Sequence, residues 1–385
     1  MPMYHRVGQF PQKKHTTFRK PDGSLYWEEL FSTLGFDGIY STFHRLHQPP
    51  VVHSVKELSL NLIEPWEDAP VAPLHYFTGR ETYGGNLLTG RRYHLYNEDC
   101  ALATASFDQD PELLYRNAKA DEILFVNEGE GVLQTECGSL TFGKWDYLVI
   151  PRGLVYRIDH LTPENRFFII ESNGPVETPK RYRNEFGQLL EHAPFHERDL
   201  RLPQFREPID QVSPTKLWVK SFQRVFEYTL GHHPFDVVGW DGYLYPWAFN
   251  IKDFNPIVGK IHLPPPVHQV FRGKGMVVCN FVPRLFDFHE DAVPAPYYHQ
   301  NVDSDEVLYY VDGDFMSRKG IEPGSVTLHP GDVPHGPQPG KVEASVGVKD
   351  CYEYAVMVDT FKPLKLTKKV KPISDPNYVR SWLGG

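Results

Sequence analysis

Two histidines and one glutamate in the second half of this 385-residue chain have the side-chain types that a catalytic metal site needs. His299, Glu306 and His335 could supply two neutral imidazole nitrogens and one carboxylate oxygen. Three such ligands on one side of a metal leave the opposite side free for substrate and dioxygen, as in non-haem Fe(II) oxygenases. Zinc accepts similar ligands, but the lack of nearby cysteines and the open side favour a catalytic metal over a structural one.

An internal repeat supports this interpretation. Residues 115–129 align without gaps on residues 299–313 at a constant offset of 184 (299 − 115), and residues 151–156 match residues 330–335. At the positions of the three candidate ligands, the first copy has Tyr115, Glu122 and Tyr156. The second copy can therefore bind a metal, whereas the first has lost both imidazoles.

Each residue of this set also has a structural interpretation. A single histidine beside a Pro or Gly turn is more often a hydrogen-bonded structural residue than a ligand. It is the register shared by the two copies that favours a metal site at His299 and His335. Glu122 has no histidines at the equivalent positions, and we expect it to be a salt-bridged or hydrogen-bonded structural acid.

Three further histidines are candidates for contact with a substrate. His329 lies six residues before His335, across a Pro-Gly turn that could bring both imidazoles to one pocket, and it is the first candidate for an acid or base. His262 and His268 lie on a proline-rich loop that could hang over a barrel mouth. Either could be only a surface residue, and we expect this of His268 in particular.

Strand alternation bears on which of two adjacent acids faces the site. With a period of two, Glu306 shares a face with Leu308, whereas Asp305 shares the other face with Val307. Only one of these acids can therefore face a barrel interior. An interior carboxylate beside apolar side chains is costly without a partner, and a cation is the simplest partner.

Composition restricts the class of protein. A hydrophobic fraction of 41% is typical of a folded chain, and 34 prolines favour short strands joined by turns over long helices. The net charge of −9 is spread along the chain and gives no nucleic-acid surface. The four cysteines lack paired spacing, and no apolar run is long enough for a signal peptide or a membrane helix. We therefore expect a cytoplasmic, mainly β protein.

The positions of turns and apolar runs predict five segments. Residues 1–50 form an arm, with one short helix in residues 26–34. Alternating runs bounded by Gly, Pro, Asn and Asp predict two antiparallel β-sandwich or barrel domains with few short helices. Their expected limits, with the linker between them and the tail, are 51–191 for the barrel without metal ligands, 192–216 for the linker, 217–365 for the catalytic barrel and 366–385 for the tail.

The second half of the chain resembles the homogentisate 1,2-dioxygenase family, whose members are two-barrel cupin enzymes. The resemblance is carried by residues 234–254, which begin Pro-Phe-Asp-Val-Val, by residues 296–301 around His299, and by residues 325–337, which contain His329-Pro-Gly-Asp-Val-Pro-His335. These motifs occur together and in order. The first half of the chain resembles the family only weakly.

The resemblance implies a bicupin fold and an Fe(II) cofactor held by His299, Glu306 and His335. It also implies that His329 and His262 are pocket residues, the latter acting on the substrate hydroxyl. The implied reaction opens the ring of homogentisate with O2 to give maleylacetoacetate, a step in tyrosine and phenylalanine catabolism. Family members assemble as trimers or hexamers, so we expect a homo-oligomer.

The sequence departs from the family pattern at two positions. In the animal and proteobacterial branch the glutamate follows the first histidine by six residues, which here selects Asp305. The spacing of seven to the next glycine selects Glu306 instead, and we prefer it because the strand after the acid fixes the face. The second departure is Phe315, where that branch has a pocket tyrosine, and it leaves the ring substituents of the substrate open.

Two other functions are compatible with these residues. One is a ring-cleaving iron enzyme for gentisate, another hydroquinone or a related phenol, and Phe315 is the feature that favours it. The other is a non-catalytic two-barrel protein that binds a small ligand, because degenerate metal sites such as the first copy occur in such proteins. Function must be argued from the site and not from the fold.

Overall fold

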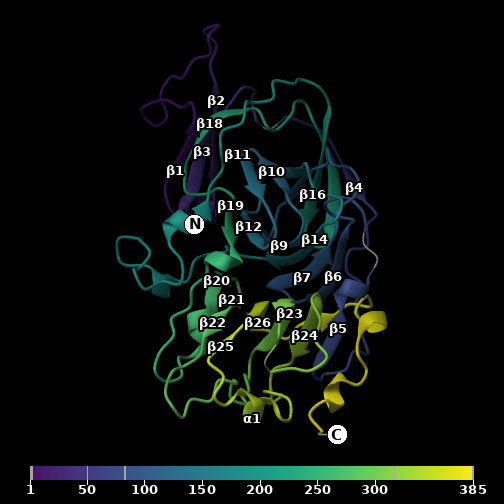
Figure 1. The fold of residues 1–385 in the computed structure, drawn as a ribbon. Coiled ribbons are helices and arrows are strands. Elements are labelled where there is room, and N and C mark those ends of the chain that lie inside the picture. The colour runs from purple at the N-terminus through teal and green to yellow at the C-terminus, as the bar shows by residue number, and fades with distance from the viewer. Residues whose placement is uncertain (1–2, 50, 82–83, 316, 384–385) are drawn as a thin grey trace.

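The chain folds into two stacked β-barrels with an N-terminal arm. The computed structural model describes residues 3–49, 51–81, 84–315 and 317–383. Figure 1 shows one barrel above the other, and the C-terminus lies at the far end of the second barrel. The bicupin architecture expected from the sequence is confirmed. No helix in these described ranges is long and apolar enough to cross a bilayer.

Two large sheets form the first barrel. In the order of pairing, the seven-stranded sheet contains β11 (Gly138–Phe142), β10 (Gly131–Thr135), β13 (Tyr156–Asp159), β8 (Leu114–Asn117), β16 (Thr215–Ser221), β17 (Arg224–Leu230) and β4 (Val52–Leu58). The eight-stranded sheet contains β15 (Leu200–Arg201), β19 (Trp247–Asn250), β12 (Asp146–Ile150), β9 (Asp121–Glu128), β14 (Arg166–Ser172), β7 (Cys100–Ala105), β6 (Arg91–Tyr96) and β27 (Lys365–Leu366). These strand counts refer to the described part of the chain.

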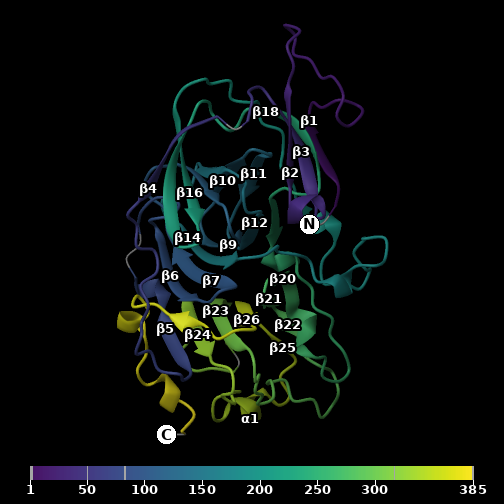
Figure 2. The same cartoon turned by 180° about the vertical axis from the view of Figure 1, so that it is seen from behind.

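The second barrel is built around one sheet of six strands in the described residues. Its order is β20 (Gln269–Gly273), β21 (Met276–Phe281), β26 (Glu353–Thr360), β23 (Asp305–Gly313), β24 (Ser325–His329) and β5 (Leu74–Phe77). A separate short pair is formed by β22 (Arg284–Leu285) and β25 (Asp350–Cys351). Figure 2 shows β23, β24 and β26 side by side, with β5 at the edge.

Strand pairing crosses the boundary expected at residues 192–216 in both directions. Strands β16, β17 and β19 follow that segment but pair within the sheets of the first barrel. Conversely, β5 precedes it and pairs with β24 of the second barrel. The fading apolar periodicity marks a surface segment but carries no information about where the next strands pair. We therefore propose that residues 215–250 belong to the first barrel and residues 74–77 to the second.

An aromatic layer joins the two barrels. The Phe168 ring stacks on the Tyr309 ring with centroids 4.6 Å apart, and the Tyr147 ring meets the Phe271 ring edge-on at 5.2 Å. The Tyr147 hydroxyl donates to Asn280 across the same interface at 2.6 Å. One continuous core cluster contains residues of both barrels, so burial of these large rings stabilises their relative placement.

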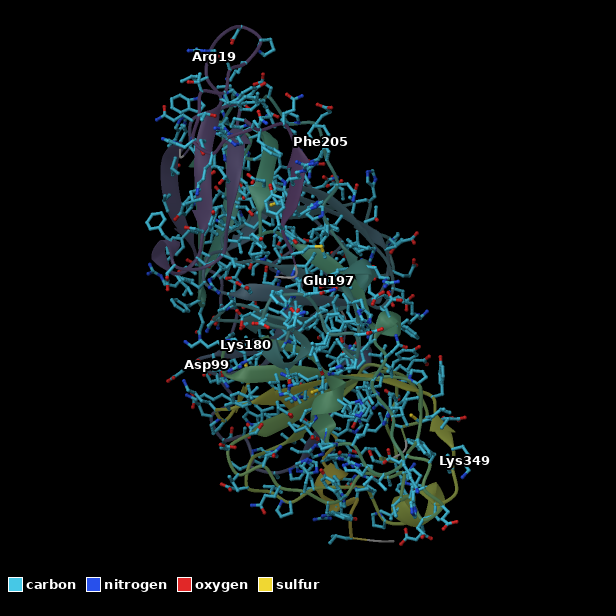
Figure 3. All side chains as sticks on the ribbon, turned by 90° about the vertical axis from the view of Figure 1, so that its left-hand side faces the viewer. Arg19, Asp99, Lys180, Glu197, Phe205 and Lys349 are labelled. Atoms are coloured by element: carbon cyan, nitrogen blue, oxygen red, sulfur yellow. The ribbon has the colours of Figure 1, made fainter. Side chains whose placement is uncertain are left out.

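The arm forms a separate sheet, and the helix expected in residues 26–34 is wrong. The sheet order is β1 (His5–Gly8), β18 (Val237–Gly242), β3 (Tyr40–Arg45) and β2 (Trp27–Ser32). A nine-residue amphipathic segment is too short to hold a helix in water, and pairing with β3 satisfies its backbone instead. In Figure 3 the arm carries Arg19 to one end of the molecule, and Lys349 lies at the other.

Helices are short, as expected from the proline content. The described residues contain one α-helix, α1 (Lys341–Ser345), and 3-10 turns at Leu34–Phe36, Thr78–Arg80, Lys180–Tyr182, Glu197–Asp199, Ile251–Asp253, Pro265–His268, Lys371–Ile373 and Tyr378–Arg380. The last of these turns packs against the second barrel, where it contributes to the site described next.

Candidate metal centre

Strand β23 turns Glu306 inward and Asp305 outward. The two carboxylate oxygens of Asp305 accept hydrogen bonds from the backbone N–H groups of Gly331 and Leu364, each at 2.7 Å. Asp305 is thus a structural anchor, and Glu306 points to the candidate histidines. The sequence-based preference for Glu306 over Asp305 agrees with this geometry.

His299 and His335 are brought together by an isolated antiparallel bridge. The N–H of each residue donates to the carbonyl of the other at 2.9 Å. The first barrel repeats this pairing with Tyr115 opposite Tyr156. The two copies of the repeat therefore share one register in three dimensions, with tyrosines in one barrel where the other has histidines.

The three candidate ligands converge on a common point. Nε2 of His299 lies 3.6 Å from Oε2 of Glu306, and Nε2 of His335 lies 3.5 Å from Oε1. The three potential ligand atoms all lie within 4.8 Å of one another, which is a spacing that one metal ion can span.

His335 also has the protonation pattern that a metal ligand requires. Nδ1–H of His335 donates to the Val333 carbonyl at 3.0 Å, which leaves the lone pair on Nε2. That Nε2 is buried and has no hydrogen-bond partner in the described structure. A buried imidazole nitrogen of this kind is costly unless something binds it, so the residues fit a divalent metal.

Electrostatics keeps the central carboxylate ionised. Burial alone would raise the pKa of Glu306, but hydrogen bonds from the imidazoles of His299 and His329 outweigh it and hold that pKa well below its usual range. In the same contact, Glu306 raises the pKa of His299 against the opposing effect of burial. An anionic Glu306 with two imidazoles is the donor set expected for a divalent cation.

His329 lies between Glu306 and Tyr378. Its Nδ1 is 2.9 Å from Oε1 of Glu306, and its Nε2 is 3.2 Å from the Tyr378 hydroxyl. The side chain is completely buried, and burial lowers its pKa to about 4. His329 is therefore placed to orient Glu306, and direct proton exchange with a substrate does not fit this position.

A cavity of about 450 Å³ opens beside His299 and Glu306. His262 and His268 both line it. His262 is exposed and meets the Tyr297 ring edge-on at 5.0 Å. His268 is half-buried, and burial lowers its pKa to about 3. The expectation that His268 is a loop surface residue is thus wrong, because the turn at Pro265–His268 directs it inward against β21.

Asp359 is an unforeseen acid in the same cavity. It pairs across the sheet with Glu306, so the two side chains share a face. Its Oδ1 is buried without a hydrogen-bond partner among the described residues. Burial and the Glu306 charge raise its pKa to about 8. No spacing in the sequence indicates Asp359, because strand pairing alone brings it to the site.

In the first barrel an arginine occupies the place of a metal. Arg91 is buried and forms ion pairs through Nη1 with Glu122 and with Glu171, the latter at 2.9 Å. Its Nη2 donates to the Tyr156 hydroxyl at 2.9 Å. Glu122 is thus salt-bridged, as expected. Glu171 pairs with Glu122 in the sheet as Asp359 pairs with Glu306, so both barrels bring two acids together.

Phe315 lies in the wall of the cavity. Its ring meets the Tyr310 ring at 4.6 Å, and both residues line the space beside the candidate metal centre. The Tyr310 hydroxyl is engaged by a hydrogen bond with Thr327 at 3.2 Å. This part of the wall is apolar.

Comparison with known proteins identifies relatives over most of the chain. Family models described as homogentisate 1,2-dioxygenase N-terminal and C-terminal match residues 87–251 and 265–384. The "Putative dioxygenase" of Saccharolobus solfataricus is 42% identical over 385 residues, which is 99% of each chain.

More distant relatives carry a specific name. The homogentisate 1,2-dioxygenase of Bradyrhizobium diazoefficiens is 28% identical over 66% of this chain and 55% of its own length. That of Rhodopseudomonas palustris BisA53 is 27% identical over 78% of this chain and 67% of its own. The chain thus spans little more than half of the first of these two enzymes.

Solved structures resemble this chain only remotely. Bacillus subtilis oxalate decarboxylase gives a TM-score of 0.33 at 12% identity and covers 77% of this chain and 79% of its own. A cupin 2 conserved barrel domain protein from Leptotrichia buccalis gives a TM-score of 0.31 at 11% identity, with coverage of 82% and 99%. Likenesses this distant carry no argument about the site.

Proposed function

Because this chain belongs to the homogentisate 1,2-dioxygenase family, we propose that it is an Fe(II)- and O2-dependent dioxygenase that opens the ring of homogentisate to give maleylacetoacetate. The dioxygenase class follows from the family, and the substrate and pathway are the proposal. The observation that carries it is the convergence of His299, Glu306 and His335 at the wall of a cavity of about 450 Å³. A space of this size suits one substituted aromatic ring.

The proposed roles follow from where each side chain lies. His299, Glu306 and His335 would hold the iron, which when bound supplies a site where O2 and substrate meet. His329 holds Glu306 in place through its 2.9 Å contact. His262, at the open side of the cavity, is placed to accept the proton of a substrate hydroxyl. The apolar wall around Phe315 excludes water from the ring.

A second candidate substrate is gentisate or another hydroquinone. Phe315 favours it, because the animal and proteobacterial branch of the family has a tyrosine at this position and the phenylalanine removes a hydroxyl from the wall. The same metal centre would serve either ring, so the difference between them lies in how the cavity receives ring substituents.

An oxygen-uptake assay distinguishes these candidates. The iron-loaded protein is incubated with homogentisate or gentisate, and the product is detected by its ultraviolet spectrum. We expect oxygen consumption and a ring-opened product with homogentisate, at a higher kcat/KM than with gentisate. Faster turnover of gentisate would assign the second candidate, and no uptake with either ring would reject ring cleavage.

The substitution Glu306→Gln tests the ligand assignment. An amide is a poor substitute for the anionic oxygen, so we expect loss of most bound iron together with activity. Metal content per chain is measured by mass spectrometry beside the oxygen assay. The matched control is Glu122→Gln in the first barrel, which should leave iron content unchanged. Normal iron content and turnover in Glu306→Gln would contradict the assignment.

We also propose that the protein is cytoplasmic and assembles as a homo-oligomer, as the family does. Light scattering of the full chain tests the assembly, and a lone species of 44.4 kDa would contradict it.

A further inference from the structure

Among the residues that the structure describes, the buried arginines and lysines have carboxylate partners, with one exception. Arg45 is paired with Glu29, Glu136 and Asp236. Arg91 is paired with Glu122 and Glu171, and Lys220 is paired with Glu171 at 2.6 Å. Arg318 is buried to the same degree, with 7% of its surface exposed, yet no carboxylate lies within 4.0 Å of it in the described residues.

The contacts that Arg318 does make are neutral. Nη1 donates to the carbonyls of Ser317 at 3.2 Å and Gly336 at 2.7 Å. The guanidinium lies 5.5 Å from the Trp382 ring, and the Tyr378 hydroxyl lies beside it. Nε is buried and without a hydrogen-bond partner among the residues described. The Glu306 carboxylate favours the charged form of Arg318 from beyond ion-pair distance, but no carboxylate pairs with the guanidinium directly, so a further anion can bind there.

The position of Arg318 indicates where that anion comes from. Arg318 lines the same cavity as His299 and Glu306, three residues after the apolar wall at Phe315. Gly336, whose carbonyl accepts from Arg318, directly follows His335. A small molecule that reaches the candidate metal centre therefore shares its cavity with an unpaired guanidinium.

We propose that Arg318 is the receptor for the carboxylate of an aromatic acid that binds beside the metal centre. This inference rests on the proposed function, and it specifies that the substrate is a hydroxylated ring with an anionic side chain. Guanidinium and carboxylate are matched in charge and planar geometry. Arg318 would thus provide a polar contact to the substrate in a part of the cavity where Phe315 has no hydroxyl.

Binding of an acid and of its neutral ester tests the proposal without turnover. The probes are 4-hydroxyphenylacetate and its methyl ester, titrated into the full-length protein by calorimetry. We expect the acid to bind about 10- to 100-fold more tightly than the ester, as one charge-assisted hydrogen-bonded contact provides. In Arg318→Met this preference should fall to about one, because only the acid loses a partner.

Two further variants keep the test independent of folding. Arg318→Lys retains the charge and should keep a preference for the acid. Arg284→Met removes another arginine of the same cavity, but one already paired with Glu353 at 3.0 Å, and should leave the acid-to-ester ratio unchanged. Equal binding of acid and ester by the unmodified protein, or an unchanged ratio in folded Arg318→Met, would overturn the proposal.

Failure of the proposed function gives a different result. If neither homogentisate nor hydroquinone is opened but the acid still binds through Arg318, only the reaction is wrong. If homogentisate and hydroquinone are both opened with the same KM, and Arg318→Met lowers kcat/KM for the two rings equally, the dioxygenase assignment stands and the carboxylate receptor is rejected.

Discussion

Arg91 explains how one barrel of a metal-binding pair remains stable without a metal. Its guanidinium supplies the positive charge that Glu122 and Glu171 need in the interior, and Lys220 completes the balance through Glu171. Two buried acids and two buried cations form a closed set. The loss of both imidazoles in this copy is thus matched by a cation from the chain itself.

The substitution Arg91→Met should therefore destabilise the protein by about 3–5 kcal/mol, because it leaves Glu122 as an uncompensated buried charge. Urea unfolding of the metal-loaded protein measures the loss, and iron content per chain should not change. The control Arg224→Met removes a solvent-exposed pair with Glu57 and should have little effect. A loss no larger than that of the control would contradict this account of the barrel.

The C-terminal tail is an element of the metal centre. The turn at Tyr378–Arg380 carries the hydroxyl that contacts Nε2 of His329, and Trp382 Nε1–H donates to the Gly336 carbonyl at 3.1 Å. A hydrogen-bonded path thus runs from the tail through His329 to Glu306. Such outer contacts orient ligands and adjust their basicity.

We expect Tyr378→Phe to weaken metal binding by about 10-fold with little change in thermal stability, because one outer contact of this kind typically has that effect. Competition with a chelator measures the affinity. Tyr352→Phe, which removes an exposed hydroxyl bonded to Asp312 at 2.9 Å, is the matched control. Equal affinities of the two variants would show that the tail only covers the barrel.

The elements that sequence patterns could predict are those with local signals. Alternation and the glycine spacing selected Glu306, and the repeat predicted Glu122 as a structural acid. Gly129 directly follows β9 and Gly313 is the last residue of β23, and both have positive φ values, of 104° and 114°. The strand at residues 27–32 was missed because its partner β3 decides its conformation.

Other features of the site could not be read from spacing. Asp359 reaches the cavity through cross-strand pairing, and Arg318 is distinctive only because it lacks a partner that other buried cations have. The six-residue spacing predicted that the imidazoles of His329 and His335 come together, and the two rings do stack with centroids 4.5 Å apart. The spacing did not predict that Glu306 and Tyr378 lie on either side of His329. Such relations depend on which strands meet in space.

At the scale of the whole molecule, buried histidines make stability depend on pH. His94 is fully buried, its Nε2 lies 2.6 Å from the Thr104 hydroxyl, and burial lowers its pKa from 6.5 to about 3. The nearby charges of Lys369 and Arg92 act in the same direction. The Glu81 carboxylate lies 3.7 Å from Nε2 of His94, and burial is the dominant effect on the pKa.

The pKa of His94 is lower in the folded chain than in the unfolded chain, so the unfolded chain binds more protons between pH 6.5 and 3. The contribution of His94 to stability is therefore full above pH 6.5 and is lost as the pH is lowered towards 3. We expect His94 to account for about 2–3 kcal/mol of the loss between pH 7.5 and 4.5. Urea unfolding at both pH values should show that His94→Gln loses less stability on acidification than the unmodified protein. The control His192→Gln, at an exposed position, should lose as much as the unmodified protein. An identical pH response in His94→Gln would refute this origin.

The position of β5 in the second barrel has a consequence for how such a protein can change over generations. When a strand from the first half of the chain completes the sheet of the second barrel, recombination between the two halves removes an edge strand from that sheet. The pair is inherited as a unit, and one member is then free to lose its chemistry while it remains indispensable as a partner.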